Sequence, residues 1–109
     1  MNPNDATNEE LRDWLAIRLG WTRNDDGSWG FVNKHGKVSK WSWDPIPNSI
    51  DAAAKCLPEG WIDYTAGIAR AAVRTIGKAG CVTVDRTTDE ATDRFRLAVK
   101  AIQATEDGK

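Results

Sequence analysis

The segment 28–43, SWGFVNKHGKVSKWSW, constrains the fold more than any other part of the chain. It holds three of the six tryptophans and one of the two phenylalanines. Its centre, residues 33–36 (NKHG), is typical of a tight turn in which glycine takes a left-handed conformation. A loop of this kind pairs Trp29 with Trp41 in the flanking strands. We therefore predict a β-hairpin here.

The pairing decides which side chains share a face of this hairpin. Because side chains alternate along a strand, the predicted register places four aromatic residues on one face: Trp29, Phe31, Trp41 and Trp43. A two-residue turn at residues 35–36 would shift the pairing by one and divide the aromatic residues between the faces. We favour the first register because it gathers the apolar surface. A sheet buried beneath helices needs such a face, so we expect it to form the floor of the core.

Capping patterns predict three helices around the hairpin. Residues 7–10 (TNEE) form a capping box that opens a helix over about 8–19, with Gly20 ending it. Asn48 or Ser49 caps a short helix over 50–57. A second box at 87–90 (TTDE) opens a long amphipathic helix reaching about residue 104. Its expected apolar face is Ala91, Phe95, Ala98, Val99 and Ile102, and its expected solvent side is Asp93, Arg96, Lys100 and Gln103.

Residues 61–86 are consistent with two structures. Ile68, Ala72 and Ile76 recur at helical spacing in an alanine-rich stretch. The same region also divides into three strands, 61–66, 68–76 and 81–86, with turns at Gly67 and at 77–80. Glycine at both ends of the middle segment favours strands. The fold class we predict is α+β, an antiparallel sheet made of the hairpin and this meander, packed by the three helices.

Composition limits the function classes. The formal net charge of −1 and a pI near 5.8 argue against duplex-DNA binding, which needs a clear basic excess. No apolar run is long enough to cross a membrane, and the polar first residues indicate no signal peptide. We expect a cytoplasmic single domain over residues 1–109, with a loose arm at 1–6, a frayed tail at 105–109 and reduced thiols at Cys56 and Cys81.

The order of these elements resembles a known family. A capped helix ending in Gly20-Trp21, a segment LPEGW at 57–61 and an alanine-containing closing helix are similar to the small phage and prophage proteins that have a phage ABA sandwich domain. The resemblance spans roughly residues 8–104. It implies a sheet sandwiched by helices, with strands at 61–86, and a host-cell cytoplasmic location. It carries over no site residues, because these motifs are fold signatures.

Residues for catalysis or metal binding are scarce. His35 is the only histidine, and it falls on the predicted hairpin turn. Asp25-Asp26-Gly27 lacks the spacing of a calcium loop, and GKAG at 77–80 lacks the length and ending of a phosphate loop. We therefore predict no enzyme activity, no metal and no cofactor.

Two groups of residues are candidates for binding. Trp29, Trp41 and Trp43, with Lys40 nearby, are suited to the core but also to a stacking platform. We expect Trp43, at a strand end, to be the most exposed of them. Arg70 and Arg74 share a face whether their segment is a strand or a helix, and they are suited to a phosphate or an acidic partner.

We predict a binding protein of phage type that acts on a host protein, or sequesters a nucleotide signal, as a counter-defence factor. The alternatives are a single-stranded nucleic-acid-binding protein and a structural subunit that forms homo-oligomers.

Overall fold

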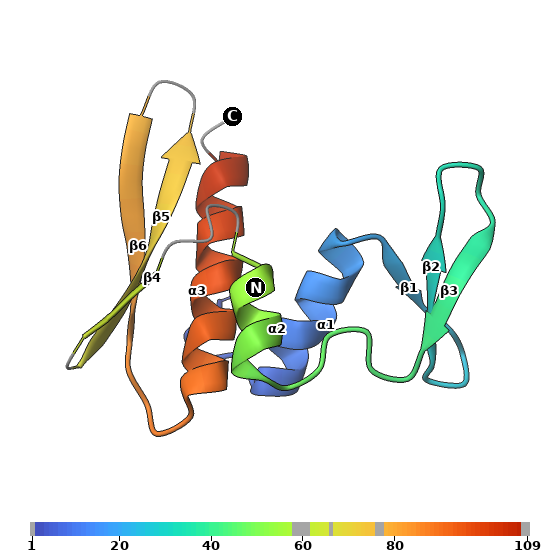
Figure 1. Cartoon of the computed structure of the whole chain (residues 1–109), viewed down its shortest axis with the longest axis horizontal. Helices are drawn as coiled ribbons and strands as arrows, with labels where there is room; N and C mark the ends of the chain where they lie inside the picture. Colours follow the sequence, from blue (N-terminus) through green and yellow to red (C-terminus); the bar gives the residue numbers. More distant parts are fainter. Residues whose placement is uncertain (1, 58–61, 66, 76–77, 108–109) are drawn as a thin grey trace.

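Three helices separate two antiparallel sheets in the computed structural model, which describes residues 2–57, 62–65, 67–75 and 78–107 (Figure 1). The helices are α1 (Asn8–Arg18), α2 (Ile50–Lys55) and α3 (Glu90–Asp107). Sheet A contains β1 (Trp21–Arg23), β2 (Trp29–Val32) and β3 (Val38–Ser42), in that order. Sheet B contains β4 (Ile62–Thr65), β5 (Ile68–Thr75) and β6 (Lys78–Asp85), in that order. The predicted α+β class is therefore confirmed.

The helix caps follow from the sequence. The Thr7 hydroxyl accepts a hydrogen bond from Glu10 N at 3.2 Å, and Glu10 Oε1 accepts from Thr7 N at 3.3 Å, which is the predicted capping box. Ser49 caps α2 by accepting from Ala52 N. The prediction for α3 was wrong in position. The Asp89 carboxylate, rather than the Thr87 hydroxyl, accepts from Thr92 N, and the helix begins at Glu90.

Residues 62–65, 68–75 and 78–85 form the strands that glycine spacing favoured. The inner face of β5 presents the small side chains Ala69 and Ala71, both fully buried, and α3 packs directly on β5 and β6. Strand β6 begins earlier than predicted, because residues 78–80 belong to it rather than to the turn that we predicted at 77–80.

Helix α3 is the centre of the molecule. It contacts sheet B on one side and α1 and α2 on the other (Figure 1). A helix covered on two sides needs buried residues around most of its circumference. Leu97 and Ala101 are accordingly buried, as are the predicted apolar residues Phe95, Ala98 and Val99. Asp93, which we placed on the solvent side, is fully buried, and that prediction was wrong.

Sheet A corrects the predicted hairpin register. The turn is as predicted, because Gly36 has a φ of 78° and Asn33 N donates to Lys37 O at 2.8 Å. Val32 pairs with Val38, also as predicted, but Phe31 pairs with Lys40, so Ser39 is an extra residue that forms a β-bulge. Beyond the bulge Trp29 pairs with Ser42 and Gly30 with Trp41. The four aromatic residues therefore do not share one face.

Strand β1 was not predicted. Its three residues pair with β2, Trp21 with Phe31 and Arg23 with Trp29, and they complete sheet A. Through β1 the sheet contacts α1. The layers are thus sheet B, helices and sheet A, so the helices lie between the sheets (Figure 1). The resemblance to the phage family implied the reverse, a sheet between helices.

Parts of both terminal segments belong to the folded structure. Pro3 and Ala6 of the segment we expected to be a loose arm are buried, and Asp5 N donates to Asn2 O at 3.1 Å. In the segment we expected to fray, residues 105–107 continue α3.

Candidate functional site

The outer face of sheet A is the most unusual surface of the molecule. Residues paired directly across two strands point to the same side of a sheet. Val32 and Val38 therefore share a face with Trp41, and Trp41 packs edge-to-face on Trp43 with ring centroids 5.1 Å apart. All four side chains are exposed, Trp41 to 55% and Trp43 to 61%. We call these four residues the outer aromatic face.

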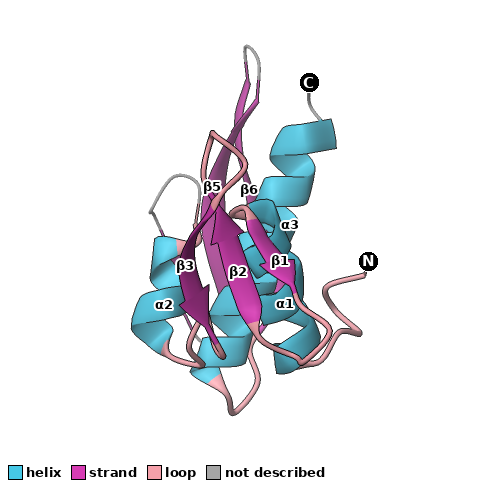
Figure 2. Ribbon diagram, turned by 90° about the vertical axis from the view of Figure 1, so that its right-hand side faces the viewer, coloured by secondary structure: helices cyan, strands magenta, loops and turns pink. Residues whose placement is uncertain are grey.

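No described segment covers this face. Figure 2 views sheet A from outside, with the three strands in front and the helices behind them. The two indoles contact each other and are open to solvent, so they form an exposed apolar patch. A large patch of this kind is typical of a binding surface. Isolated exposed apolar residues need no such explanation, whereas these four are neighbours.

The inner face of sheet A fixes it to the helices. Trp29 is only 3% exposed and belongs to the core cluster, against which Trp14 and Trp21 pack. The Arg23 guanidinium lies 5.0 Å from the Trp29 ring centroid and pairs with Asp13 of α1 at 3.3 Å. The two faces therefore differ, because the inner one holds the buried Trp29 and the outer one is exposed to solvent.

The β1–β2 turn is held by a polar cluster. Asp26 Oδ1 accepts hydrogen bonds from Ser28 N at 2.9 Å and from Ser28 Oγ at 2.5 Å. These bonds favour the ionised carboxylate and hold the pKa of Asp26 below its usual range. Ser28 itself is fully buried, and Asn24 donates to its hydroxyl. This cluster fixes the start of β2, and with it the position of Trp29.

The segment after Trp43 is anchored to α1. Asp44 pairs with Arg12 at 3.0 Å, and Arg12 also donates to Ile46 O at 3.2 Å. Ile46 is buried in the core. Trp43 is therefore presented on a fixed strand end, which lowers the entropy cost of binding through it.

Basic residues lie at the turn of the hairpin. Lys34, His35 and Lys37 are exposed there, and Asn33 Oδ1 accepts from the backbone N–H of His35 and of Lys37. The outer aromatic face thus ends at a basic turn on one side. At the other end of β3 lies the acidic Asp44.

The structure separates the candidate residues that we grouped from the sequence. Trp43 is exposed, as expected, and Trp41 is exposed although we placed it in the core with Trp29. Lys40 points to the inner side, with its ammonium 5.6 Å from the Phe31 ring centroid.

The two arginines lie elsewhere. Arg70 is on sheet B, at the opposite end of the molecule from Trp43, and it forms an ion pair with Asp63 (Figure 1). The side chain of Arg74 lies outside the described residues. The two sheets therefore do not bring Trp43 and Arg70 into one site.

A buried polar network was missed by the sequence reasoning. The Asp93 carboxylate accepts from Tyr64 Oη at 2.8 Å, from Thr87 N at 2.9 Å and from Thr87 Oγ1 at 2.8 Å. Arg86 and Arg94 lie over the Tyr64 ring, with guanidinium carbons 3.9 and 5.1 Å from its centroid. The one signal for this network in the sequence was the position of Asp93, six residues after Thr87 and in the first turn of α3.

Other site types find no support in the described part of the chain. Its residues include no group of three or more His, Cys, Asp or Glu side chains placed to hold a metal ion. None of the described helices is long and apolar enough to cross a bilayer. Cys56 is half-buried and Cys81 exposed, and both are free.

Comparison with models of protein families, with curated proteins and with solved structures found no match to this chain.

Proposed function

We propose that this chain is a binding protein that recognises a partner protein through the outer aromatic face of sheet A. The observation that carries the proposal is the exposed Trp41–Trp43 pair beside two exposed valines, on a sheet whose other face holds the buried Trp29. Tryptophan is the residue type most enriched among the energetic centres of protein interfaces.

The free energy gained by covering the exposed indoles favours a partner larger than one ring system. Covering the exposed half of an indole removes about 100 Å² from water, which contributes about 2.5 kcal/mol at 25 cal/mol per Å². Two such rings give about 5 kcal/mol, while association costs at least about 4 kcal/mol in lost freedom. A stable complex must therefore also cover Val32 and Val38. Their aliphatic side chains suit a protein surface better than a nucleotide.

Charge gives a further property of the partner. The turn at one end of the face carries Lys34 and Lys37, which would meet acidic residues at the rim of the partner surface. A host protein as the partner, and its occlusion as the counter-defence mechanism, rest only on the sequence resemblance to the phage ABA sandwich proteins, whose implied layer order this structure does not have (Figure 1). Capture of a nucleotide between Trp43 and Arg70 gains no support, because these residues lie on different sheets.

A capture experiment tests the proposal with matched variants. Three proteins are immobilised: the wild type, the double variant Trp41→Ser/Trp43→Ser and the control Ile17→Ser. Each is exposed to host-cell lysate, and the proteins that it retains are quantified by mass spectrometry. Ile17 is as exposed as Trp43 but lies on α1. We expect a partner that wild type and the control retain and the double variant loses at least tenfold. Equal retention by all three proteins would refute the proposal.

A second candidate function rests on the basic turn. Exposed indoles beside Lys34 and Lys37 are also the elements of a stacking platform for single-stranded nucleic acid. Fluorescence anisotropy with a short oligothymidylate at two salt concentrations distinguishes the two candidates. A salt-sensitive complex that Lys34→Gln/Lys37→Gln abolishes would favour nucleic acid as the ligand. If no complex forms with the oligonucleotide, the protein partner is favoured.

A further inference from the structure

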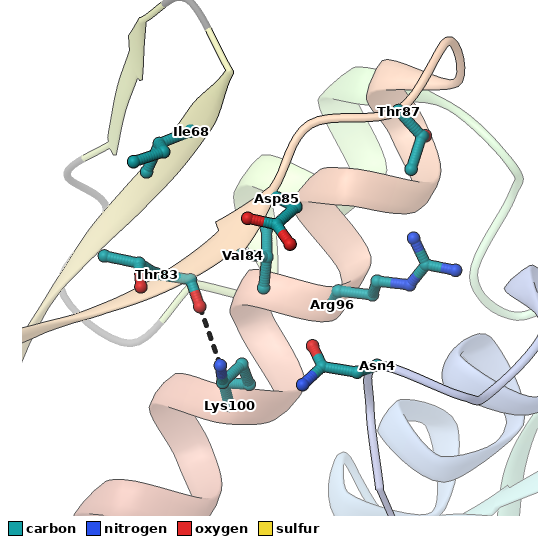
Figure 3. Close-up of a pocket in the computed structure, with 8 residues that line it drawn as sticks. All are labelled: Asn4, Ile68, Thr83, Val84, Asp85, Thr87, Arg96 and Lys100. Carbon is teal, nitrogen blue, oxygen red and sulfur yellow. Dashed lines mark hydrogen bonds between the residues drawn. The ribbon is translucent and has the colours of Figure 1, made fainter.

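A polar cavity lies at the junction of sheet B, α3 and the N-terminal segment, away from the outer aromatic face. Its volume is about 380 Å³, within the range of sites that hold small molecules. Figure 3 shows the polar side chains around it: Asn4 from the N-terminal segment, Thr83 and Asp85 from β6, Thr87 from the following loop, and Arg96 and Lys100 from α3.

Arg96 has hydrogen-bond donors that the fold leaves unused. Its Nε is buried and makes no hydrogen bond within the described part of the chain. Its Nη1 lies 3.9 Å from Asp93 Oδ1, which is too far for a hydrogen bond, and Asp93 already accepts from Tyr64 and Thr87. The side chain is only 20% exposed. Buried donors are almost always paired in folded proteins, so an unpaired guanidinium nitrogen beside a cavity requires a reason.

Lys100 adds a second cation on the same side of α3. It lies four residues after Arg96, one helical turn away. Its ammonium donates one hydrogen bond to Thr83 O at 2.7 Å (Figure 3). An ammonium has three protons, so two donors remain for a ligand. Figure 3 shows the Lys100 ammonium turned toward Thr83 and the Arg96 guanidinium extending away from it, so the two cations line different parts of the cavity.

Asp85 places a negative charge in the same cavity. Its carboxylate forms no ion pair with the residues that the structure describes, although Arg96 and Lys100 line the same space. An anion alone would be attracted by the two cations and repelled by Asp85. A molecule with an anionic end and a donor end would satisfy all three groups.

We propose that this cavity binds a small molecule in which a phosphate or carboxylate group adjoins an amine. The anionic group is bound by Arg96, with charge-assisted hydrogen bonds that give the buried Nε its partner, and Lys100 adds positive charge to the same cavity. The amine donates to Asp85. This site is independent of the outer aromatic face, so either can exist without the other.

Matched probe pairs test the proposal. Ethyl phosphate is compared with phosphoethanolamine, and propionate with β-alanine, so the members of each pair differ essentially by the amine. Binding is followed by NMR through the Nε–H signal of Arg96 and the amide signals of residues 83–87. We expect saturable shifts in at least one pair and an affinity about tenfold higher for the amine-containing member, which corresponds to about 1.4 kcal/mol. No saturable shift with any of the four probes would overturn the proposal, and so would equal affinities within both pairs.

Three variants assign the roles, with one control. Asp85→Asn should remove the tenfold preference for the amine-containing probes while binding of the anionic group is retained. Arg96→Gln and Lys100→Met should each weaken all probes at least tenfold, and the second serves if the first fails to fold. Arg18→Gln, an arginine on α1 paired with Glu106, should leave the affinity unchanged. Wild-type affinity in both the Arg96 and the Lys100 variant would contradict the site.

Discussion

At the scale of single residues, the three hairpin tryptophans have different environments. Trp29 is buried beneath sheet A, while Trp41 and Trp43 lie on its outer side. The sequence identifies Trp43 as the most exposed of them, but composition and alternation do not separate Trp41 from Trp29. The deciding residue is Ser39, and its identity gives no sign that it forms a bulge.

The different burial of the tryptophans predicts different costs of substitution. Trp29→Ala removes a buried ring and should lower the free energy of unfolding by about 3–5 kcal/mol. Trp41→Ser should cost no more than about 1 kcal/mol, mainly the edge-to-face contact with Trp43. Denaturant unfolding of the two variants measures both. Equal costs would contradict the assigned faces.

The sole tyrosine of the chain reports on the buried network. Burial, and then the hydrogen bond to Asp93, raise the pKa of Tyr64 above its ordinary value of 10.0. The raised pKa favours the neutral phenol in the folded state. Its contribution to stability is therefore present below pH 10 and is lost as the pH rises through the folded pKa.

Titration of the Tyr64 ring by NMR measures this shift. We expect a midpoint above the ordinary value in the wild-type protein. Asp93→Asn removes a charge that opposes ionisation, so the midpoint should move down toward the ordinary value. A wild-type midpoint at or below the ordinary value would contradict the network.

At the scale of elements, the caps of α1 and α2 and the hairpin turn were predicted correctly, whereas the cap of α3, burial and register were not. The Thr7 box, the Ser49 cap and the Gly36 turn depend on neighbouring residues, and each lies where the sequence placed it. Strand β1 and the burial of Asp93 depend on packing between distant segments. A three-residue strand has too short a pattern to recognise. Asp93 is polar, and only its partners Tyr64 and Thr87 make its burial tolerable.

The bulge itself can be tested by deletion. Removing Ser39 leaves the pairs Val32–Val38, Phe31–Lys40 and Gly30–Trp41 in a regular ladder, so the deletion should retain the outer position of Trp41. Cross-strand nuclear Overhauser contacts report the pairing. Contacts between Trp29 and Trp41 in the deletion variant would contradict the expected ladder.

The α1 cap gives an element-scale prediction with a known magnitude. Thr7→Ala removes the hydroxyl that accepts from Glu10 N and should cost about 1 kcal/mol. Thr7→Ser retains that acceptor and is the matched control. Thermal unfolding followed by circular dichroism compares the two. A similar loss in both variants would mean that the methyl group, rather than the cap, is responsible.

At the scale of the whole molecule, the two sheets are held differently. Helix α3 packs on sheet B and on both other helices, whereas sheet A contacts the helices through β1 and α1. This asymmetry also shows why the candidate site was only partly predictable. The sequence indicated that aromatic residues in 28–43 face a binding surface or a core. The structure buries Trp29 in the core and leaves Trp41 and Trp43 exposed on the opposite face.

The asymmetry predicts unequal local stability. Strands β2 and β5 are each the central strand of a three-stranded sheet, so they are matched in backbone pairing. We expect the amides of β2 to exchange faster than those of β5, because sheet A opens without disrupting α3. Native-state hydrogen exchange measures both. Equal protection would indicate that the molecule unfolds as one unit.

The Ser39 bulge turns Trp41 and Trp43 outward while Trp29 remains in the core. The most direct measurement is the solvent accessibility of each indole N–H, from NMR relaxation caused by a soluble paramagnetic probe in dilute protein. We expect strong relaxation at Trp41 and Trp43 and protection at Trp29. Protection of Trp41 equal to that of Trp29 would contradict this arrangement.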